Sequence, residues 1–347
     1  MLPSQTRRFE TAARRVRGHL GHGLLSLLVA VCSAAPTLAQ PAVELPVAEQ
    51  RWPVPGALAV AKDPDARWTL DQLEDPEGPS FLPMTQSNLG LVKGQVFARF
   101  RVHNSSDQTV HKVLELQHSA MLGSVELRVM DGDTLVERWY GGAARPANKR
   151  MLDTPNPAFA LSFPAGSERT LLLHLEPQGS PLSLYPTLWD TPAFLREVQL
   201  QQAVLWCYFG FLLVMALYNL VLFVTLRESA RGYLVGFIAT NILMGAASWG
   251  ITTQLLGRTD AVGPWFAYVP NAFLMLLFTQ QFTRSALETR TRTPRCDRAL
   301  RWFGRFYLLM ALCSLGLEPR LAMQIFAATF APCLAICTVT GLASAIS

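Results

Sequence analysis

The chain has 347 residues, of which half are apolar and only 16% are charged, and its formal net charge is +5. The apolar residues concentrate after residue 200, so the composition excludes one uniform soluble domain and favours a soluble part followed by a membrane part. The arginines lie near the N-terminus and between the apolar segments, which is the distribution of a membrane protein. We therefore expect no nucleic-acid partner, despite the basic net charge.

Residues 1–39 have the pattern of a secretory signal peptide. Five arginines precede an apolar run over Leu24–Val31, and small residues follow as far as Ala39. We expect cleavage between Ala39 and Gln40. Cleavage after Ala35 and an uncleaved anchor helix are the alternatives, although the apolar run is short for a membrane span.

Residues 40–190 carry the alternation of apolar and polar side chains that is typical of β-strands. In Val96–His103 every second residue is apolar, and similar runs occur at 125–129 and 171–175. Turn sequences such as Asn104–Asp107 separate the runs. Short strands with turn signals between them predict an antiparallel β-sandwich in this exported domain.

Two further features of the exported domain follow from single residues. Thr69 and Gln72 have the spacing of a capping box, so we expect a helical turn there. Residues 40–190 contain no Cys, so no disulfide framework can hold the domain together. Its stability must come from a packed core, which about 150 residues can supply.

Few residues of this domain suggest chemistry. The acidic stretch Asp63–Glu77 is expected to be a solvated surface, because it lacks the regular oxygen spacing of a calcium loop. The aromatic side chains either pack in the core, which is the commoner role, or include a stacking platform for a sugar ring. They are Trp52, Trp68, Trp139, Tyr140, Tyr185 and Trp189. We expect no catalytic residue, no metal site and no cofactor, and the sequence does not identify the ligand-binding residues.

Residues 191–347 are expected to form an α-helical transmembrane bundle. Apolar segments predict five spans, over residues 203–226, 233–256, 264–283, 302–317 and 321–345. The loops after the first and third segments carry most of the arginines in this half of the chain. The positive-inside rule therefore places both loops in the cytoplasm and residues 40–190 in the periplasm.

The polar residues inside these segments are neutral. No Asp, Glu or Lys lies centrally in a segment, whereas proton pumps and ion-coupled transporters usually carry one there. Four residues are candidates for packing contacts that switch between two helix arrangements: Tyr218, Asn219, Asn241 and Asn271. Static contacts that hold the helices together are the alternative.

The two domains are joined without a flexible linker. Thr191 is a suitable N-cap, Pro192 suits the first helical position, and no helix breaker intervenes before Leu226. We expect one helix of about 35 residues, roughly 52 Å long at 1.5 Å per residue. Such a helix would connect the last strand, at residues 182–189, directly to the first span.

Sequence blocks in both domains are similar to those of one bacterial family. They are Asn88–Gly90, Phe97–Asn104, Leu122–Val129 and Leu182–Trp189 in the exported domain, and Gly210, Met215, Tyr218, Asn219 and Tyr233 in the membrane domain. In these blocks and in its domain order, the chain resembles the seven-transmembrane receptors with diverse intracellular signalling modules. The resemblance implies a type 2 extracellular domain, which is a jelly-roll-like sandwich related to carbohydrate-binding modules, followed by seven membrane helices.

What the resemblance implies is the sensory half of a receptor in the bacterial inner membrane. The expected partners are the lipid bilayer, a small carbohydrate-like ligand and a second copy of the chain in a homodimer. A kinase or nucleotide-cyclase effector is expected beyond residue 347. Because only five of seven helices are predicted, we expect a C-terminally truncated chain. A transporter or channel subunit and a structural membrane anchor of an envelope complex are the alternative functions.

Overall fold

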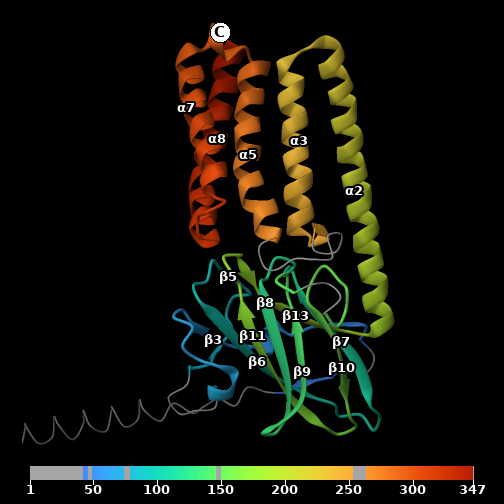
Figure 1. The fold of residues 1–347 in the computed structure, drawn as a ribbon. Helices are drawn as coiled ribbons and strands as arrows, with labels where there is room; N and C mark the ends of the chain where they lie inside the picture. The colour runs from blue at the N-terminus through green and yellow to red at the C-terminus, as the bar shows by residue number, and fades with distance from the viewer. Residues whose placement is uncertain (1–41, 46–48, 74–78, 146–149, 253–262, 347) are drawn as a thin grey trace, which may run out of the picture. The chain divides into compact units, whose positions relative to one another are not determined.

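The computed structural model describes residues 42–45, 49–73, 79–145, 150–252 and 263–346 (Figure 1). The expected cleavage position between Ala39 and Gln40 lies outside the described residues. An N-terminal domain of antiparallel β-sheets is followed by a helical region, which confirms the predicted fold class.

Two main β-sheets form the N-terminal domain. The first has the strand order β4-β3-β6-β11-β8-β9, with β1 beside β6, and the second has the order β10-β7-β13-β2. The strands of the first sheet are β1 (Val43–Glu44), β3 (Ala59–Asp63), β4 (Leu82–Pro83), β6 (Gln95–His103), β8 (Ser124–Asp131), β9 (Thr134–Gly141) and β11 (Glu168–Glu176). The strands of the second are β2 (Arg51–Pro53), β7 (Val110–Gln117), β10 (Ala158–Phe163) and β13 (Tyr185–Trp189). A separate pair consists of β5 (Asn88–Gly90) and β12 (Leu182–Ser183).

Between the two sheets lies the core that the alternation predicted. Along β6, Val96, Phe100 and Val102 have no exposed surface, and they belong to one cluster with buried leucines of β7, β8 and β11. Burying one Leu or Phe side chain contributes roughly 1.5–3 kcal/mol relative to leaving it exposed. This cluster is therefore what stabilises a domain without cysteines.

A second cluster covers the opposite face of the first sheet. The segment after β3 turns back and packs Leu70 and Leu73 against Phe97 and Leu172. Within it, the predicted helical turn is a 3₁₀-helix over Leu70–Gln72. The backbone N–H of Thr69 donates to Gln72 Oε1 at 3.1 Å, as the capping-box spacing predicted.

The helices of the described region run from the last strand to the end of the chain. They are α2 (Thr191–Leu226), α3 (Ser229–Ser248), α5 (Gly263–Ala286), α6 (Thr289–Arg292), α7 (Pro294–Cys313) and α8 (Pro319–Ile346). α2 is one uninterrupted helix, as predicted, but its N-cap is Asp190 and not Thr191. Two predicted spans, 233–256 and 302–317, extend past the C-terminal ends of the observed helices. α3 ends before a turn in which Gly250 has a φ of +69°, and α7 ends at Cys313.

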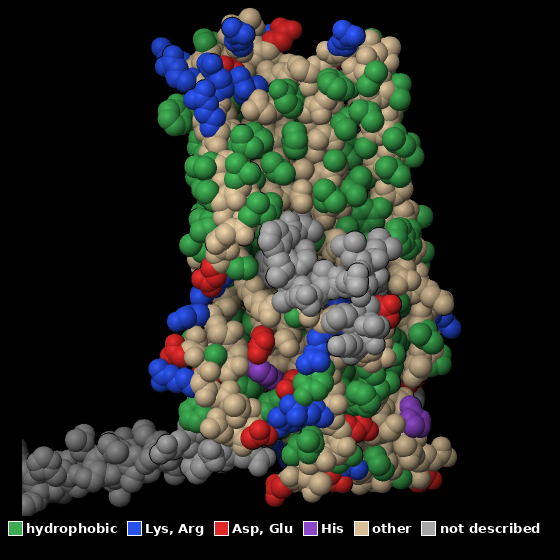
Figure 2. Space-filling view, in the orientation of Figure 1, with side chains coloured by type: hydrophobic (Ala, Val, Ile, Leu, Met, Phe, Trp, Pro, Cys, Tyr) green, Lys and Arg blue, Asp and Glu red, His purple; other side chains and the backbone are tan. Residues whose placement is uncertain are grey.

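Two helices of the described residues, α2 and the Pro319–Ser344 part of α8, are long and apolar enough to cross a membrane. Figure 2 shows apolar side chains over the surface of the helical region and Lys and Arg side chains gathered at one end of it. On α2, Val214, Leu217 and Val221 are largely exposed, which suits contact with lipid chains better than contact with water. The other three predicted spans stay a prediction.

Candidate functional site

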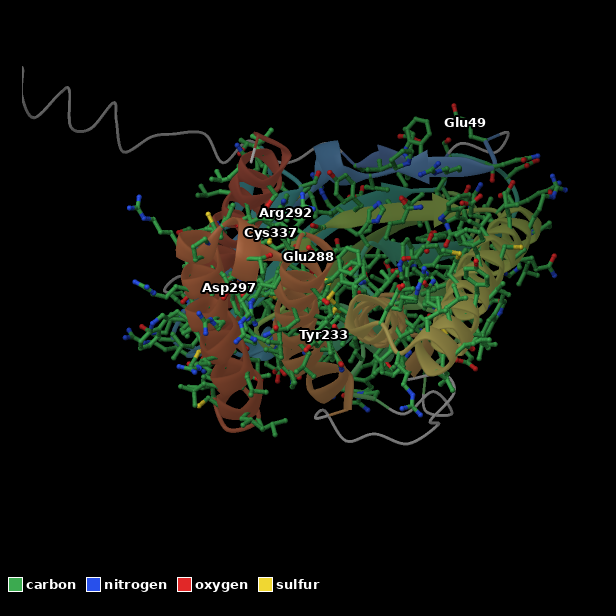
Figure 3. The ribbon with its side chains drawn as sticks, turned by 90° about the horizontal axis from the view of Figure 1, so that it is seen from above. Glu49, Tyr233, Glu288, Arg292, Asp297 and Cys337 are labelled. Atoms are coloured by element: carbon green, nitrogen blue, oxygen red, sulfur yellow. The ribbon has the colours of Figure 1, made fainter. Side chains whose placement is uncertain are left out.

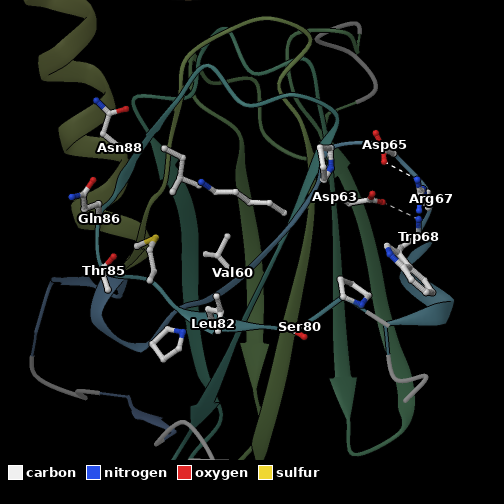
Figure 4. A pocket seen from close by; sticks show the side chains of 16 residues that line it. Val60, Asp63, Asp65, Arg67, Trp68, Ser80, Leu82, Thr85, Gln86 and Asn88 are labelled. Atoms are coloured by element: carbon white, nitrogen blue, oxygen red, sulfur yellow. Dashed lines mark hydrogen bonds and ion pairs between the residues drawn. The ribbon is translucent and has the colours of Figure 1, made fainter. Parts of the chain in front are cut away.

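An open groove of about 700 Å³ lies along β3, β4 and β5 of the sandwich (Figure 4). Its two sides carry polar side chains, with apolar ones between. One side has Asp65, Arg67 and Trp68, the other has Thr85, Gln86 and Asn88, and Val60 and Leu82 lie between them. An aromatic ring, amide groups and an apolar floor suit a small molecule that has polar edges and one apolar face, such as a sugar ring.

A buried polar network holds the Trp68 side of the groove in place. Asp63 is only 3% exposed, and its Oδ2 accepts the backbone N–H of Trp68 at 2.8 Å. Gln95 Nε2 donates to the same oxygen at 2.9 Å and to the carbonyl oxygen of Trp68 at 2.6 Å. His174 Nε2 lies 2.7 Å from Gln95 Oε1. The position of Trp68 therefore depends on three strands, because Asp63, Gln95 and His174 lie on β3, β6 and β11.

The protonation states of this network follow from its hydrogen bonds. Burial by itself would raise the pKa of the Asp63 carboxyl, but the donors at Trp68 and Gln95 outweigh it and hold that pKa below 3.8. Burial lowers the pKa of His174 below 6.5, and the nearby Glu176 offsets this only in part. Because Gln95 Oε1 can only accept, the neutral His174 donates from Nε2.

At the edge of the groove, two basic side chains pair with the exposed carboxylate of Asp65. Arg67 lies 2.9 Å and Lys93 lies 3.5 Å from the carboxylate of Asp65. Such exposed pairs contribute about 0–1 kcal/mol, so a ligand can displace them at little cost. No group of three His, Cys, Asp or Glu side chains suited to a metal ion occurs within the described residues.

The aromatic side chains considered as a sugar platform take different places. Trp68 lines the groove. Trp189 is buried, and its Nε1 donates to Glu115 Oε2 at 3.0 Å. Trp52 and Trp139 pack against the main core cluster. Core packing thus accounts for three of these side chains. Trp68 also packs against the second cluster, but because it lines the groove as well, it is the candidate for ligand stacking.

The four candidate switch residues lie on three helices. Tyr218 of α2 is 60% exposed, whereas its neighbour Asn219 is only 4% exposed. The side-chain amides of Asn219 and Asn241 each donate to the carbonyl oxygen four residues earlier on their own helix, at 2.8 and 3.0 Å. Asn271 is half-buried on α5. A switching role for these residues stays a prediction.

Sandwich and α2 are joined by a buried contact that the sequence did not predict. Lys112 of β7 has a side chain that is 2% exposed, and its Nζ donates to Asp190 Oδ1 at 2.7 Å and to the carbonyl oxygen of Glu49 at 3.3 Å. One turn into α2, Phe194 is buried beside Trp189, with ring centroids 6.5 Å apart. An ion pair and an apolar contact therefore fix the first turn of α2 to the sandwich.

A second buried charge lies next to this junction. Glu115 is 3% exposed, and its carboxylate accepts from Trp189 Nε1 at 3.0 Å and from Asn156 Nδ2 at 2.8 Å. The sequence held a signal for Lys112, which falls in phase with the buried leucines of its own strand. A charged residue at such a position usually needs a partner, but its partner lies 78 residues away and no local pattern identifies it.

Comparison with known families assigns both parts of the chain. Residues 56–190 match the family model described as 7TMR-DISM extracellular 2, and residues 201–347 match the one described as 7TM diverse intracellular signalling. No curated protein matches the chain. The chain therefore belongs to the seven-transmembrane receptors with diverse intracellular signalling, a family of membrane proteins whose N-terminal domain is extracellular.

Proposed function

We propose that the sandwich binds a small carbohydrate-like ligand outside the bacterial inner membrane and that α2 passes the signal across the membrane to a cytoplasmic kinase or cyclase module. The observation that carries the proposal is the continuity of α2. It runs for 36 residues without a break, which is roughly 54 Å at 1.5 Å per residue, from a first turn fixed to the sandwich. In this proposal the two domains bind and transmit, and neither catalyses a reaction. The membrane domain crosses the bilayer several times, and the receptor is a homodimer.

A covalent and hydrogen-bonded route leads from the groove to α2. Asn88 lines the groove and lies on β5, which pairs with β12. The next residue after β12, Leu184, donates its N–H to the carbonyl oxygen of Ser87 at 2.8 Å. β13 follows at once and leads through Asp190 into α2. If β5 can occupy two positions, each coupled to one arrangement of α2, a ligand that binds one of them more tightly shifts the equilibrium between the two arrangements. The size of the shift is set by the difference in affinity.

The ligand part of the proposal is tested with sugars and the full chain in detergent. A thermal-shift screen of monosaccharides and short oligosaccharides should yield a stabilising compound. The Trp68→Ala variant should bind it about ten-fold more weakly, the equivalent of 1.4 kcal/mol. The control is Tyr185→Ala, which removes an exposed aromatic side chain outside the groove. Equal losses in the two variants would place the binding site elsewhere.

The proposal that α2 transmits the signal is tested by making this helix flexible. Insertion of three glycines after Glu197 adds flexible backbone, at about 1 kcal/mol of helix destabilisation per glycine relative to alanine. Insertion of three alanines adds the same length and rotation but keeps the helix stiff. The readout is a fluorophore on the exposed Cys207 of α2, in a chain whose other cysteines are replaced by serine. The glycine insertion should abolish the ligand-dependent fluorescence change without altering ligand affinity. A response equal to that of the alanine insertion would exclude transmission through a rigid α2.

A further inference from the structure

A dense group of arginines lies between the end of α5 and the middle of α7. Exposed side chains of this group define an arginine face, which consists of Arg290 and Arg292 of α6 and Arg295, Arg298 and Arg305 of α7. The three arginines of α7 are three and seven residues apart, so they share one side of the helix. Figure 2 shows the basic side chains gathered at this end of the helical region.

The buried acidic residue of this segment already has hydrogen-bond and ion-pair partners. Asp297 is 2% exposed and accepts from Arg284 Nε and from Thr289 Oγ1, both at 2.9 Å. Its second oxygen lies 3.0 Å from Arg301 Nε. Asp297 thus anchors the α6–α7 connection to α5 and neutralises arginines that are not part of the arginine face.

The exposed acidic residue of this segment neutralises at most one member of the arginine face. Glu288 lies 4.0 Å from Arg292 Nε, and Figure 3 shows both side chains near Asp297 in the view down the helices. Four members have no carboxylate within ion-pair distance among the described residues. They are Arg290, Arg295, Arg298 and Arg305. A patch of four unpaired guanidinium groups fits an anionic partner.

The side chains beside the arginine face indicate what kind of anion it meets. Trp302 lies on the same side of α7 and is 68% exposed. Leu308, Leu309 and Leu312 follow further along the helix, and all three are exposed. Along this side of α7 the arginines and Trp302 come first, with Arg305 one turn after Trp302, and the exposed leucines follow. Charged and aromatic side chains followed by apolar ones match a headgroup and interface region that leads into hydrocarbon.

We propose that the arginine face binds the phosphate groups of anionic phospholipids, of the phosphatidylglycerol type, in the cytoplasmic leaflet. This inference rests on the proposed cytoplasmic location of the α5–α7 connection. A guanidinium group forms two parallel hydrogen bonds with a phosphate, and four to eight basic residues beside a membrane helix are typical of binding to anionic lipid. An acidic protein surface would match the charge but would leave Trp302 and the adjoining leucines unexplained.

The test measures which lipid the full chain retains. Purified chain in a neutral detergent is mixed with equal amounts of phosphatidylglycerol and phosphatidylcholine, captured and washed, and the bound lipids are quantified by mass spectrometry. Phosphatidylglycerol should exceed phosphatidylcholine by about five-fold or more. The ratio should fall toward one in about 1 M salt, where the screening length is about 3 Å.

Variants separate lipid binding from general charge and from misfolding. The combined variant Arg295→Gln, Arg298→Gln, Arg305→Gln should bring the lipid ratio close to one, whereas lysine at the same positions should keep most of the enrichment. The matched control Arg51→Gln, Lys93→Gln, Arg138→Gln removes three positive charges from the sandwich outside the groove and should leave the ratio unchanged. Equal binding of both lipids by the unmodified chain, or an equal loss in the control, would overturn the proposal.

Discussion

Buried charged side chains in the sandwich are surrounded by donors or by an opposite charge. The Asp63 carboxylate accepts from a backbone N–H and a side-chain amide, and the Lys112 ammonium lies against Asp190 and a carbonyl oxygen. Taking an ion out of water costs several kcal/mol, and only such contacts offset that cost. Removal of a single partner at these positions should therefore lower the free energy of unfolding strongly.

Asp63→Asn should destabilise the sandwich more than its change of one atom suggests. The amide nitrogen of asparagine cannot accept a hydrogen bond, so the N–H groups of Trp68 and Gln95 lose their charged acceptor. A hydrogen bond to a charged group contributes about 1.5–3 kcal/mol. The measurement is a urea titration of the full chain in detergent, followed by tryptophan fluorescence. Asp65→Asn is the matched control, because Asp65 is exposed and should change the free energy of unfolding by less than about 1 kcal/mol. Equal effects would mean that the buried network does not stabilise the sandwich.

His174 should make the stability of the sandwich depend on pH near neutrality. Because its pKa is lowered in the folded state, the unfolded chain binds the proton more readily. The stabilising contribution is complete above the unfolded pKa of about 6.5 and is lost as the pH falls toward the lower folded pKa. Urea titrations at pH 7.5, 6.5 and 5.5 should show this loss. The variant His174→Gln should show a smaller decrease over the same range, and an unchanged decrease would assign the effect to other groups.

Among the elements, the link from β5 through β12 and β13 to α2 joins the groove to the membrane. Each step is a hydrogen-bonded pairing or a direct chain connection, and Leu184, which joins β12 to β13, is itself hydrogen-bonded to Ser87. The last step is the Lys112–Asp190 ion pair, through which β7 also contacts the start of α2. The junction is therefore fixed from two neighbouring strands and not only through the chain itself.

The two halves of the Lys112–Asp190 pair should differ in the cost of their removal. Asp190→Ala leaves a buried ammonium without its carboxylate and should cost about 3 kcal/mol, whereas Lys112→Met replaces that ammonium by an apolar side chain of similar size and should cost less than about 1.5 kcal/mol. The side chain of Asp190 makes no capping hydrogen bond, so loss of a cap does not explain the difference. Urea titration of both variants checks the order. A larger cost for Lys112→Met would show that the pair itself is strongly stabilising.

In the whole molecule, sandwich and helices meet at more than the α2 junction. Gly179, which has a φ of +92°, lies so close to the start of α8 that an added Cβ would be 2.8 Å from the backbone nitrogen of Arg320. Leu91 and Met121 of the sandwich pack against the apolar cluster of the helices. A ligand response that survives the glycine insertion into α2 would assign the signal to these contacts instead.

The orientation of the helices can be tested with reporter fusions. Fusions after Arg231 and after Arg295 should report a cytoplasmic location, and one after Glu318 should report a periplasmic location. The reason is the excess of arginine in the connections after α2 and after α5, and the contact of the α8 start with the exported sandwich. The opposite pattern would exclude the proposed topology, and with it the cytoplasmic location of the arginine face.

The sandwich should fold without the helices. Expressed alone, residues 40–190 should be soluble and rich in β-structure by circular dichroism, because their main core cluster lies between the two sheets. Reductant should not change their melting temperature, since this segment contains no Cys. A predominantly helical spectrum would contradict the sheet assignment.

The sequence by itself determined the local features of this protein. The alternation in Val96–His103 predicts which side of β6 is buried, the spacing of Thr69 and Gln72 predicts a helical turn, and the absence of breakers after Pro192 predicts the uninterrupted α2. These features depend on periodicity and on neighbours within a few residues, so they are visible in a single chain. The resemblance to the receptor family also rests on short contiguous blocks, and the two family models confirm it.

Only the tertiary structure decided where the chemistry lies. Gln95 meets both Asp63 and His174 because β6 lies between β3 and β11 in one sheet, and Lys112 meets Asp190 because β7 lies beside β13. The groove likewise forms from segments that are separated by the turn after β3. Such contacts depend on strand order and on register across tens of residues. A pattern of period two cannot specify them, because it tells which face a side chain occupies and not which strand lies next to it.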